Sequence, residues 1–221
     1  MDIPEQAEAW AAKTGVKLAP KEYDGIPTSL PASSDVRISS LQMFDQVQGQ
    51  VVLTGTAAGP DFSYFRIQVG EGLNPQEWLQ LGGNVDTPVY SGTLGTWDTA
   101  GLQGEYIIQL MVVREDRRID QSILQVTIDN TPPEVQVTSP QEGQKVTLRA
   151  SEKLLLSVSA SDNLHLDKVD FYLDGILVGS PTEFPYALLW DTGAGEHQLL
   201  VKAYDMAGNS TEDRVTFTVI K

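Results

Sequence analysis

The chain has 221 residues, of which 41% are hydrophobic and 20% are charged, and its formal net charge is -15. At roughly 150 residues per domain, this length allows one or two domains, each large enough to bury its own core. The absence of cysteine excludes disulfides, thiolate metal sites, iron–sulfur clusters and thiol nucleophiles. The acidic residues are spread along the chain and no basic stripe occurs, so we expect no nucleic-acid partner, whereas divalent cations and basic surfaces fit the charge.

The N-terminal segment differs from the rest of the chain. Residues 4–14 are typical of a helix that begins at Pro4 and ends before Gly15. Residues 20–35, rich in Pro and Ser, predict an extended linker. We assign residues 1–35 to a helix and linker that form the tail of a preceding domain. No run of about 18 apolar residues occurs, so no membrane insertion is expected within this chain, and any export signal is expected to lie outside it.

From residue 36 onward, apolar residues alternate with polar ones at a period of two. This alternation is typical of strands with one buried face, and Gly, Pro, Asn and Asp separate the alternating runs. The pattern therefore predicts an all-β fold. The apolar positions in the first half are Val51, Leu53, Gly55 and Ala57; Phe65, Ile67 and Val69; Tyr106, Ile108, Leu110 and Val112; and Leu124, Val126 and Ile128. Those in the second half are Leu154, Leu156, Val158 and Ala160; Val169, Phe171 and Leu173; Leu199, Val201 and Ala203; and Val215, Phe217 and Val219.

The chain also contains an internal repeat. LGTWDT at residues 94–99, followed by GEY, matches LLWDT at residues 188–192, followed by GEH. The tryptophans of the two copies, Trp97 and Trp190, are 93 residues apart. That spacing is close to the roughly 100 residues of an immunoglobulin-type sandwich. The distance from an early strand to the repeated Trp is longer in the first copy by about ten residues, a tenth of a domain of this type. We place these additional residues in the segment from Glu71 to Tyr90.

The sequence IDNTPP at residues 128–133 joins the two copies. Two successive prolines fix the backbone and remove two hydrogen-bond donors, which ends strand pairing and leaves a short, stiff connector. We therefore predict two tandem immunoglobulin-like β-sandwiches, residues 36–130 and residues 131–221, preceded by the short helix and the extended linker.

The sequence contains none of the motifs typical of catalysis. One of its two histidines, His197, falls at the repeat position of Tyr106, where such sandwiches place an aromatic corner residue. We therefore assign a structural role to His197 and to Tyr106. The other histidine, His165, lies in a polar loop.

Two tripeptides, Ser161–Asn163 (SDN) and Lys13–Gly15 (KTG), resemble motifs of serine acyl-transferases that act on peptidoglycan or β-lactams. Their order is reversed and the S-x-x-K nucleophile motif is missing, so we interpret them as coincidental.

Three aspartates are candidates for a metal site. Asp129 lies in the connector, Asp162 follows the second strand of the second copy, and Asp205 lies between its last two strands. In an immunoglobulin-type sandwich these two loops cluster at the end where the chain enters, so the three carboxylates are expected to converge there. Carboxylate oxygens are the ligands that Ca²⁺ requires. The alternative is that each aspartate caps its own turn, with Gly208 or Asn209 in a left-handed conformation.

Aromatic residues supply a second set of candidates. We expect the repeated tryptophans, Trp97 and Trp190, to lie in the core or at its edge. Trp78, by contrast, lies in the insertion of the first copy, and Tyr90 at its end. These two side chains either form a stacking platform that binds sugars or cover the open end of the first sandwich, and both interpretations remain open.

At residues 129–219, the fragments DNTPPEVQV, VDFYLDG, PYALLWDT, GEHQLLVKAYDMAGN and VTFTV resemble a bacterial immunoglobulin-like domain of extracellular proteins. Residues 40–130 resemble a companion module through GQVVLTGTAAG, FRIQVGEGLNPQEW and SGTLGTWDTAGLQGEYIIQLMV. The pair is similar to the C-terminal extension of some class A penicillin-binding proteins, which are peptidoglycan glycosyltransferases and transpeptidases. The opening IPEQAEAWAAKTG is similar to the tail that leaves their transpeptidase domain. No catalytic residue is carried over, because this chain lacks the segments that hold those active sites.

The resemblance implies an extracytoplasmic location, in the cell envelope or at the surface of a bacterium. We expect a monomeric, non-catalytic module that serves as a spacer and as a docking surface for peptidoglycan or envelope proteins, with no cofactor apart from the candidate Ca²⁺. The alternative hypothesis is an adhesin or a carbohydrate-binding appendage of a secreted hydrolase or another surface protein.

Overall fold

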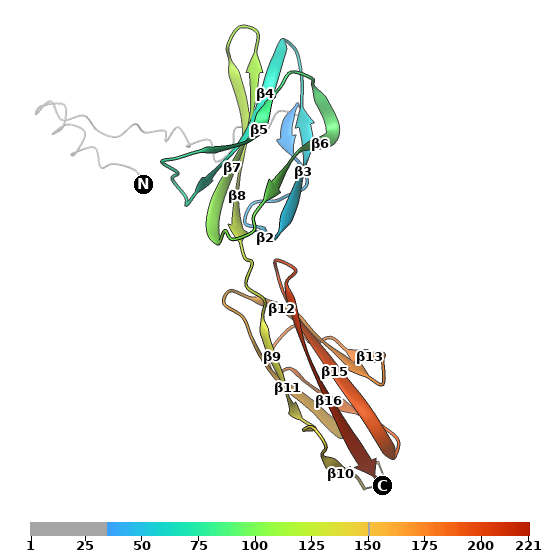
Figure 1. Cartoon of the computed structure of the whole chain (residues 1–221). Helices are drawn as coiled ribbons and strands as arrows, with labels where there is room; N and C mark the ends of the chain where they lie inside the picture. The colour runs from blue at the N-terminus through green and yellow to red at the C-terminus, as the bar shows by residue number, and fades with distance from the viewer. Residues whose placement is uncertain (1–34, 150) are drawn as a thin grey trace, which may run out of the picture. The chain divides into compact units, whose positions relative to one another are not determined.

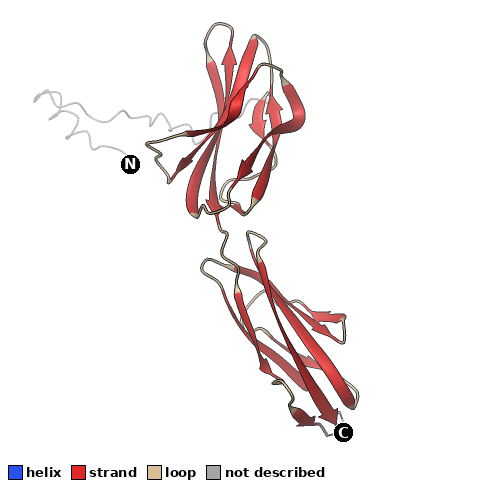
Figure 2. Ribbon diagram, in the orientation of Figure 1, coloured by secondary structure: helices blue, strands red, loops and turns tan. Residues whose placement is uncertain are grey.

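The structure is a computed structural model and describes residues 35–149 and 151–221. Within these residues the chain forms strands, turns and loops only, which confirms the predicted all-β fold (Figure 2). The helix predicted at residues 4–14 and nearly all of the linker predicted at residues 20–35 lie outside the described residues. Among the residues described, there is no helix with the length and apolarity needed to cross a membrane.

The first sandwich packs a three-stranded sheet, in the order β1-β3-β6, against a five-stranded sheet, in the order β2-β8-β7-β4-β5 (Figure 1). Neighbouring strands are antiparallel, except that β2 runs parallel to β8. The strands are β1 (Val36–Ile38), β2 (Gln46–Val47), β3 (Gln50–Ala57), β4 (Phe62–Glu71), β5 (Leu79–Val85), β6 (Val89–Asp98), β7 (Gly104–Arg114) and β8 (Ile119–Ile128).

The second sandwich repeats this arrangement strand for strand. Its three-stranded sheet has the order β9-β11-β14 and its five-stranded sheet the order β10-β16-β15-β12-β13, with β10 parallel to β16. The strands are β9 (Glu134–Ser139), β10 (Lys145–Thr147), β11 (Leu154–Ser161), β12 (Leu166–Leu173), β13 (Ile176–Gly179), β14 (Ala187–Trp190), β15 (Gly195–Asp205) and β16 (Ser210–Ile220). The sequence repeat therefore corresponds to a repeat of topology.

The core of the first sandwich follows the predicted alternation. Along β7, Ile108, Leu110 and Val112 are fully buried, and the residues between them are half-buried. Trp97 of β6 is 1% exposed, and its ring meets that of Tyr106 edge-on at a centroid distance of 5.5 Å. A buried Trp contributes about 150–250 Å² of apolar contact, so Trp97 is a major part of this core.

The second core differs from the first at the repeated tryptophan. Phe171 of β12 and Phe217 of β16 are fully buried, but Trp190, expected in the core or at its edge, is 36% exposed and is not one of the residues that form this core. The residue equivalent to Tyr106 is His197, whose ring lies 5.8 Å from that of Phe217. The second sandwich therefore lacks the Trp–Tyr pair that closes the first core.

The insertion of the first copy lies where the sequence predicts it. Residues 72–78 connect β4 to β5, whereas Asp174 and Gly175 alone connect β12 to β13. The insertion packs directly against β4 at Gly70. A Cβ atom on Gly70 would overlap the ring of Pro75, which lies in the insertion. The absence of a side chain at residue 70 thus allows the insertion to pack against its own strand.

Candidate metal centre

Three loops bring the predicted aspartates together at one end of the second sandwich. Asp129 directly follows β8, Asp162 directly follows β11, and Asp205 is the last residue of β15. Each contributes a carboxylate oxygen to a group whose members all lie within 4.8 Å of one another. The convergence predicted from the loop arrangement of the sandwich is thus present in the structure.

Asp129 is the most enclosed of the three, with 0% of its surface exposed. Its Oδ1 atom accepts hydrogen bonds from Gln103 Nε2 at 3.0 Å, Thr131 N at 3.1 Å and Asn163 Nδ2 at 3.3 Å. Its Oδ2 atom is buried and accepts no hydrogen bond from the described residues. One oxygen thus fixes the side chain, and the other remains available as a ligand.

Asp162 divides its two oxygens in the same way. Its Oδ2 atom accepts a hydrogen bond of 2.8 Å from the backbone N–H of Leu164, which is the turn cap of the alternative interpretation. Its Oδ1 atom is buried and, among the described residues, has no hydrogen-bond donor. Turn capping and metal binding therefore do not compete at this residue, because each uses a different oxygen.

Asp205 is 2% exposed and is held by the turn that follows it. Its Oδ1 accepts a hydrogen bond from the backbone N–H of Asn209 at 2.8 Å, and its Oδ2 accepts one from Asn209 Nδ2 at 2.7 Å. Gly208 has a φ of +92°, the left-handed conformation predicted for this turn, which side chains disfavour. The turn thus fixes the carboxylate within the group.

None of the ion pairs between described residues involves Asp129, Asp162 or Asp205. Three carboxylates this close repel one another in a buried site, where electrostatic interactions are stronger than in water. Together they offer hard oxygen donors from three separate segments. This donor set fits Ca²⁺ or a similar cation and gives no ligand preferred by copper or iron–sulfur chemistry.

Two amide residues, Asn130 and Asn209, hold the connector to its surroundings. Asn130 Nδ2 donates to the carbonyl oxygens of Thr99 at 2.8 Å and Leu102 at 2.9 Å, and its Oδ1 accepts from the N–H of Gly49 at 3.0 Å. In the second sandwich, Asn209 Nδ2 donates to the carbonyl oxygen of Asp129 at 2.7 Å. The connector is thus hydrogen-bonded to a loop of each sandwich.

The sequence gives no signal for the contact of Gln103 with Asp129. For Asn209 it gives a misleading one, because Asn209-Ser210-Thr211 fits the pattern for N-glycosylation. Asn209 is only 9% exposed, and its side-chain nitrogen donates two hydrogen bonds. A glycan on this nitrogen would replace one of its two N–H groups, so the nitrogen could not donate both hydrogen bonds.

The two histidines occupy different environments. His165 is exposed in the loop after Asp162. The side chain of His197 is 13% exposed, and its Nδ1 lies 2.7 Å from Asp174 Oδ2. On the other side of the ring, Nε2 lies 3.2 Å from Thr192 Oγ1 and 3.1 Å from the carbonyl oxygen of Gly193.

The contacts from Asp174 to His197 and from His197 to Thr192 resemble the acid, base and hydroxyl nucleophile of a catalytic triad, but the surroundings of these residues do not suit catalysis. Thr192 is 8% exposed, so its hydroxyl is enclosed. The carbonyl oxygen of Gly193 can only accept a hydrogen bond and therefore favours a proton on Nε2, the atom that would act as base. These contacts fix the corner of the sandwich, the structural role predicted for His197.

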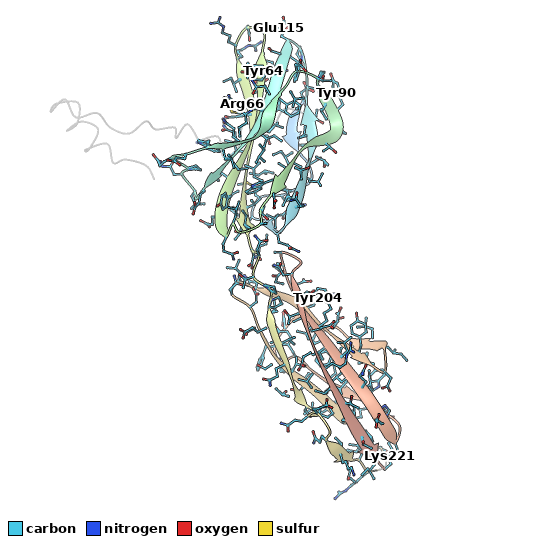
Figure 3. The ribbon with its side chains drawn as sticks, in the orientation of Figure 1. Tyr64, Arg66, Tyr90, Glu115, Tyr204 and Lys221 are labelled. Carbon is cyan, nitrogen blue, oxygen red and sulfur yellow. The ribbon has the colours of Figure 1, made fainter. Side chains whose placement is uncertain are left out.

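The candidate sugar platform is partly exposed. Trp78 is 40% exposed just before β5, and Tyr90 is 69% exposed on β6. Figure 3 labels Tyr90 on the first sandwich. These strands belong to different sheets of the first sandwich. The ring contacts of the described residues join Trp97 to Tyr106, Phe184 to Tyr186 and His197 to Phe217, and none joins Trp78 to Tyr90.

Comparisons with known proteins agree with this architecture. Residues 133–201 match the family described as Bacterial Ig domain. No curated protein matches the chain. Among solved structures, the chain resembles the fibronectin(III)-like modules of Clostridium thermocellum CbhA, with 23% identity, a TM-score of 0.57 and coverage of 83% of this chain and 93% of that one. Murine CEACAM1b has 17% identity and a TM-score of 0.40, over 80% of this chain and 95% of that one.

The likeness to the CbhA modules extends over both sandwiches and, at this level of identity, shows the fold alone. The family match lies within the second sandwich and covers less than half of the chain. Bacterial immunoglobulin domains are typically extracellular or displayed at the surface, and such domains are generally non-catalytic. The chain is therefore a tandem immunoglobulin-like or fibronectin(III)-like β-sandwich module whose second sandwich matches the bacterial immunoglobulin domain family.

Proposed function

We propose that this chain is a non-catalytic, extracytoplasmic spacer at the C-terminal end of a peptidoglycan-synthesis enzyme of the class A penicillin-binding type. The hydrogen bonds that hold the connector to both sandwiches carry this proposal. Asn130 ties the connector to the carbonyl oxygens of Thr99 and Leu102, and Asn209 ties it to the second sandwich through Asp129. A spacer needs such ties, because a free linker would let the two sandwiches move independently.

The parent enzyme is inferred from the resemblance of IDNTPP, of the Trp-Asp-Thr repeat and of the N-terminal IPEQAEAWAAKTG to those extensions. The test is the reading frame upstream of residue 1. An S-x-x-K motif followed by a K-T-G block would support a transpeptidase parent. A glycoside hydrolase or protease domain in that place would reject it, and the spacer role would then apply to a different enzyme.

We further propose that the module docks on peptidoglycan or on envelope proteins through exposed loops and strands. Sedimentation of the purified chain with insoluble peptidoglycan tests direct wall binding. Pelleting that depends on peptidoglycan concentration is expected if the wall is the partner. If the chain stays in the supernatant, wall binding is rejected and docking must involve protein.

A second candidate function, a carbohydrate-binding appendage or adhesin of a secreted hydrolase, is favoured by one observation. Tyr90 and Trp78 expose 69% and 40% of their surface on the first sandwich, and exposed aromatic rings stack on sugars. Trp78→Ala and Tyr90→Ala should then abolish pelleting with glycan while leaving the melting temperature unchanged. Loss of stability in Trp78→Ala would instead identify Trp78 as a packing residue.

A further inference from the structure

We propose that Asp129, Asp162 and Asp205 form a Ca²⁺ site where the connector enters the second sandwich. The first support is the donor set, because three carboxylates from three loops place oxygens within 4.8 Å of one another. Ligand oxygens on opposite sides of Ca²⁺ lie up to about 5 Å apart, whereas Mg²⁺, with its shorter bonds, draws them to about 4 Å. The spacing thus suits Ca²⁺.

The second support is independent of the cluster itself. Asp129 is fully buried, and its Oδ2 atom accepts no hydrogen bond from the described residues. Buried carboxylate oxygens in native proteins are nearly always hydrogen-bonded, ion-paired or bound to a metal, because an isolated buried charge is costly. Asp162 Oδ1 is buried and unpartnered in the same way. A cation between the two would satisfy both oxygens.

The third support comes from the repeat. Strands β7 and β15 are equivalent, each with eleven residues that begin with Gly, and they end at Arg114 and Asp205 respectively. Where the second sandwich has a buried carboxylate, the first has a guanidinium. Arg114 donates to the carbonyl oxygens of Ala58 at 2.7 Å and Pro60 at 3.0 Å, and pairs with Asp120 at 2.6 Å.

The guanidinium of Arg114 also lies close to the start of the first sandwich. A Cβ atom on Gly59 would lie 2.9 Å from Asp35 Oδ2 and 3.1 Å from Arg114 Nη1. In the first sandwich, the side chain of Arg114 thus supplies a positive charge at the end of β7. The second sandwich has Asp205 at the equivalent position, and we infer that its positive charge is supplied by the bound cation.

Binding at this site would join the connector to both loops of the second sandwich. Asp129 belongs to the connector, Asp162 directly follows β11, and Asp205 is the last residue of β15. A ligand that binds only the folded state stabilises it by mass action. The ion is therefore expected to raise the stability of the second sandwich, independently of which parent enzyme the module serves.

Calorimetric titration of the whole chain with CaCl₂, after removal of divalent cations with a chelator, tests the site directly. We expect one Ca²⁺ per chain and weaker or no binding of Mg²⁺. With free Ca²⁺ at about 100 times its dissociation constant, a thermal transition should rise by about 10–20 °C, the shift expected for a domain of this size. No heat and no shift would overturn the proposal.

Two variants locate the site. Asp162→Asn keeps an oxygen that can accept the hydrogen bond from Leu164 N but removes the charge, so the turn is preserved and Ca²⁺ affinity should fall at least tenfold. Asp191→Asn removes the same charge from an exposed position in the same sandwich and should leave the affinity unchanged. Equal affinity in both variants and the parent chain would place any bound ion elsewhere.

A measurement that does not rely on stability completes the test. Tb³⁺ takes the same oxygen ligands as Ca²⁺ and luminesces when excited through a nearby tyrosine, and Tyr204 directly precedes Asp205. At a Tb³⁺ concentration equal to the dissociation constant of the parent chain, we expect luminescence that Ca²⁺ displaces, that falls severalfold in Asp162→Asn and that is unchanged in Asp191→Asn. Undiminished luminescence in Asp162→Asn at that concentration would overturn the assignment.

Discussion

The side-chain nitrogen of Asn209 lies 2.7 Å from the carbonyl oxygen of Asp129 and 2.7 Å from the Oδ2 atom of Asp205. One buried amide thus joins the connector to the turn between β15 and β16. Removing a buried donor leaves its acceptors unpaired, which costs more than the net value of a typical hydrogen bond. The contact is therefore important both for the connector and for the turn that fixes Asp205.

We predict that Asn209→Ala lowers the free energy of unfolding of the second sandwich by about 1–3 kcal/mol, the cost of unpairing a buried polar group. Urea denaturation in buffer with chelator measures this change without any contribution from Ca²⁺. Asn163→Ala is the control, because Asn163 is exposed and donates to Asp129 only at 3.3 Å. An equal loss in both variants would show that burial of Asn209 has no special effect.

Arg114 leads to a prediction for the first sandwich. Its side chain is 5% exposed and bonds the carbonyl oxygens of Ala58 and Pro60 as well as the carboxylate of Asp120. Asp120 is 46% exposed and can be hydrated when Arg114 is replaced, whereas the carbonyl oxygen of Ala58 stays buried, so the cost is that of unpairing a buried polar group, about 1–3 kcal/mol. Arg114→Met, which keeps most of the volume, should therefore lower the unfolding free energy of the first sandwich by about that amount.

Arg118→Met is the matched control for Arg114→Met. Arg118 is 70% exposed and pairs with Asp116 at 2.5 Å, also at the surface. Exposed ion pairs contribute little, since water screens them and two flexible side chains must be ordered. Thermal unfolding of both variants should show a large loss for Arg114→Met and none for Arg118→Met; comparable losses would contradict the role of burial.

Much of the fold could be predicted from the sequence, because a half-buried strand requires the period of two that Ile108, Leu110 and Val112 display. The meeting of Asp129, Asp162 and Asp205 was also predictable, since the topology of the sandwich brings their loops to one end. Neither inference needs a detail of side-chain packing.

The contacts that depend on packing could not be predicted in the same way. Asp129 binds Gln103, which lies in a loop of the first sandwich 26 residues earlier, and periodicity carries no information about such a pair. The repeat also predicted a position in the core or at its edge for both Trp97 and Trp190, without distinguishing the two. Trp190 lies at the end of the four-residue edge strand β14, and the position of its expected aromatic partner holds His197.

His197 predicts a pH dependence of stability. Burial alone would lower its pKa, but the hydrogen bond to Asp174, the carbonyl oxygen of Gly193 and the charge of Asp174 together raise the pKa above its ordinary 6.5. Because the folded-state pKa lies above that of the unfolded chain, this stabilisation is fully present below about pH 6.5 and is lost as the pH rises through the folded-state pKa.

Asp174, the hydrogen-bond partner of His197, determines the pH below which this stabilisation is lost. Although burial opposes it, the hydrogen bonds from His197 and from the N–H of Gln198, with the charge of His197, hold the pKa of Asp174 below its usual 3.8. That contribution is present above about pH 3.8 and is lost as the pH falls through the lowered pKa. The pair is therefore most stabilising between about pH 4 and pH 6.5.

We expect the melting temperature of the parent chain to exceed that of His197→Gln by more at pH 5.5 than at pH 8.5. Comparing the two chains at each pH removes the general effect of the net charge of -15, which also changes with pH. His165→Gln, in an exposed loop of the same sandwich, serves as the control. A difference between parent and His197→Gln that is constant with pH would show that the imidazole acts only by packing on Phe217.

The two tryptophans of the repeat should respond differently to truncation. Trp97 is 1% exposed and packs on Tyr106, so Trp97→Ala leaves an enclosed cavity and should cost about 3–5 kcal/mol in the first sandwich. Trp190 is 36% exposed, and water can fill the space that Trp190→Ala leaves, so its cost should be smaller by at least about 1 kcal/mol. Differential scanning calorimetry measures both costs.

Fluorescence quenching by iodide in each variant checks exposure independently. The exposed Trp190 remains in Trp97→Ala and the buried Trp97 remains in Trp190→Ala, so iodide should quench Trp97→Ala more strongly. Equal costs together with equal quenching would mean that the second core closes over its tryptophan as the first does.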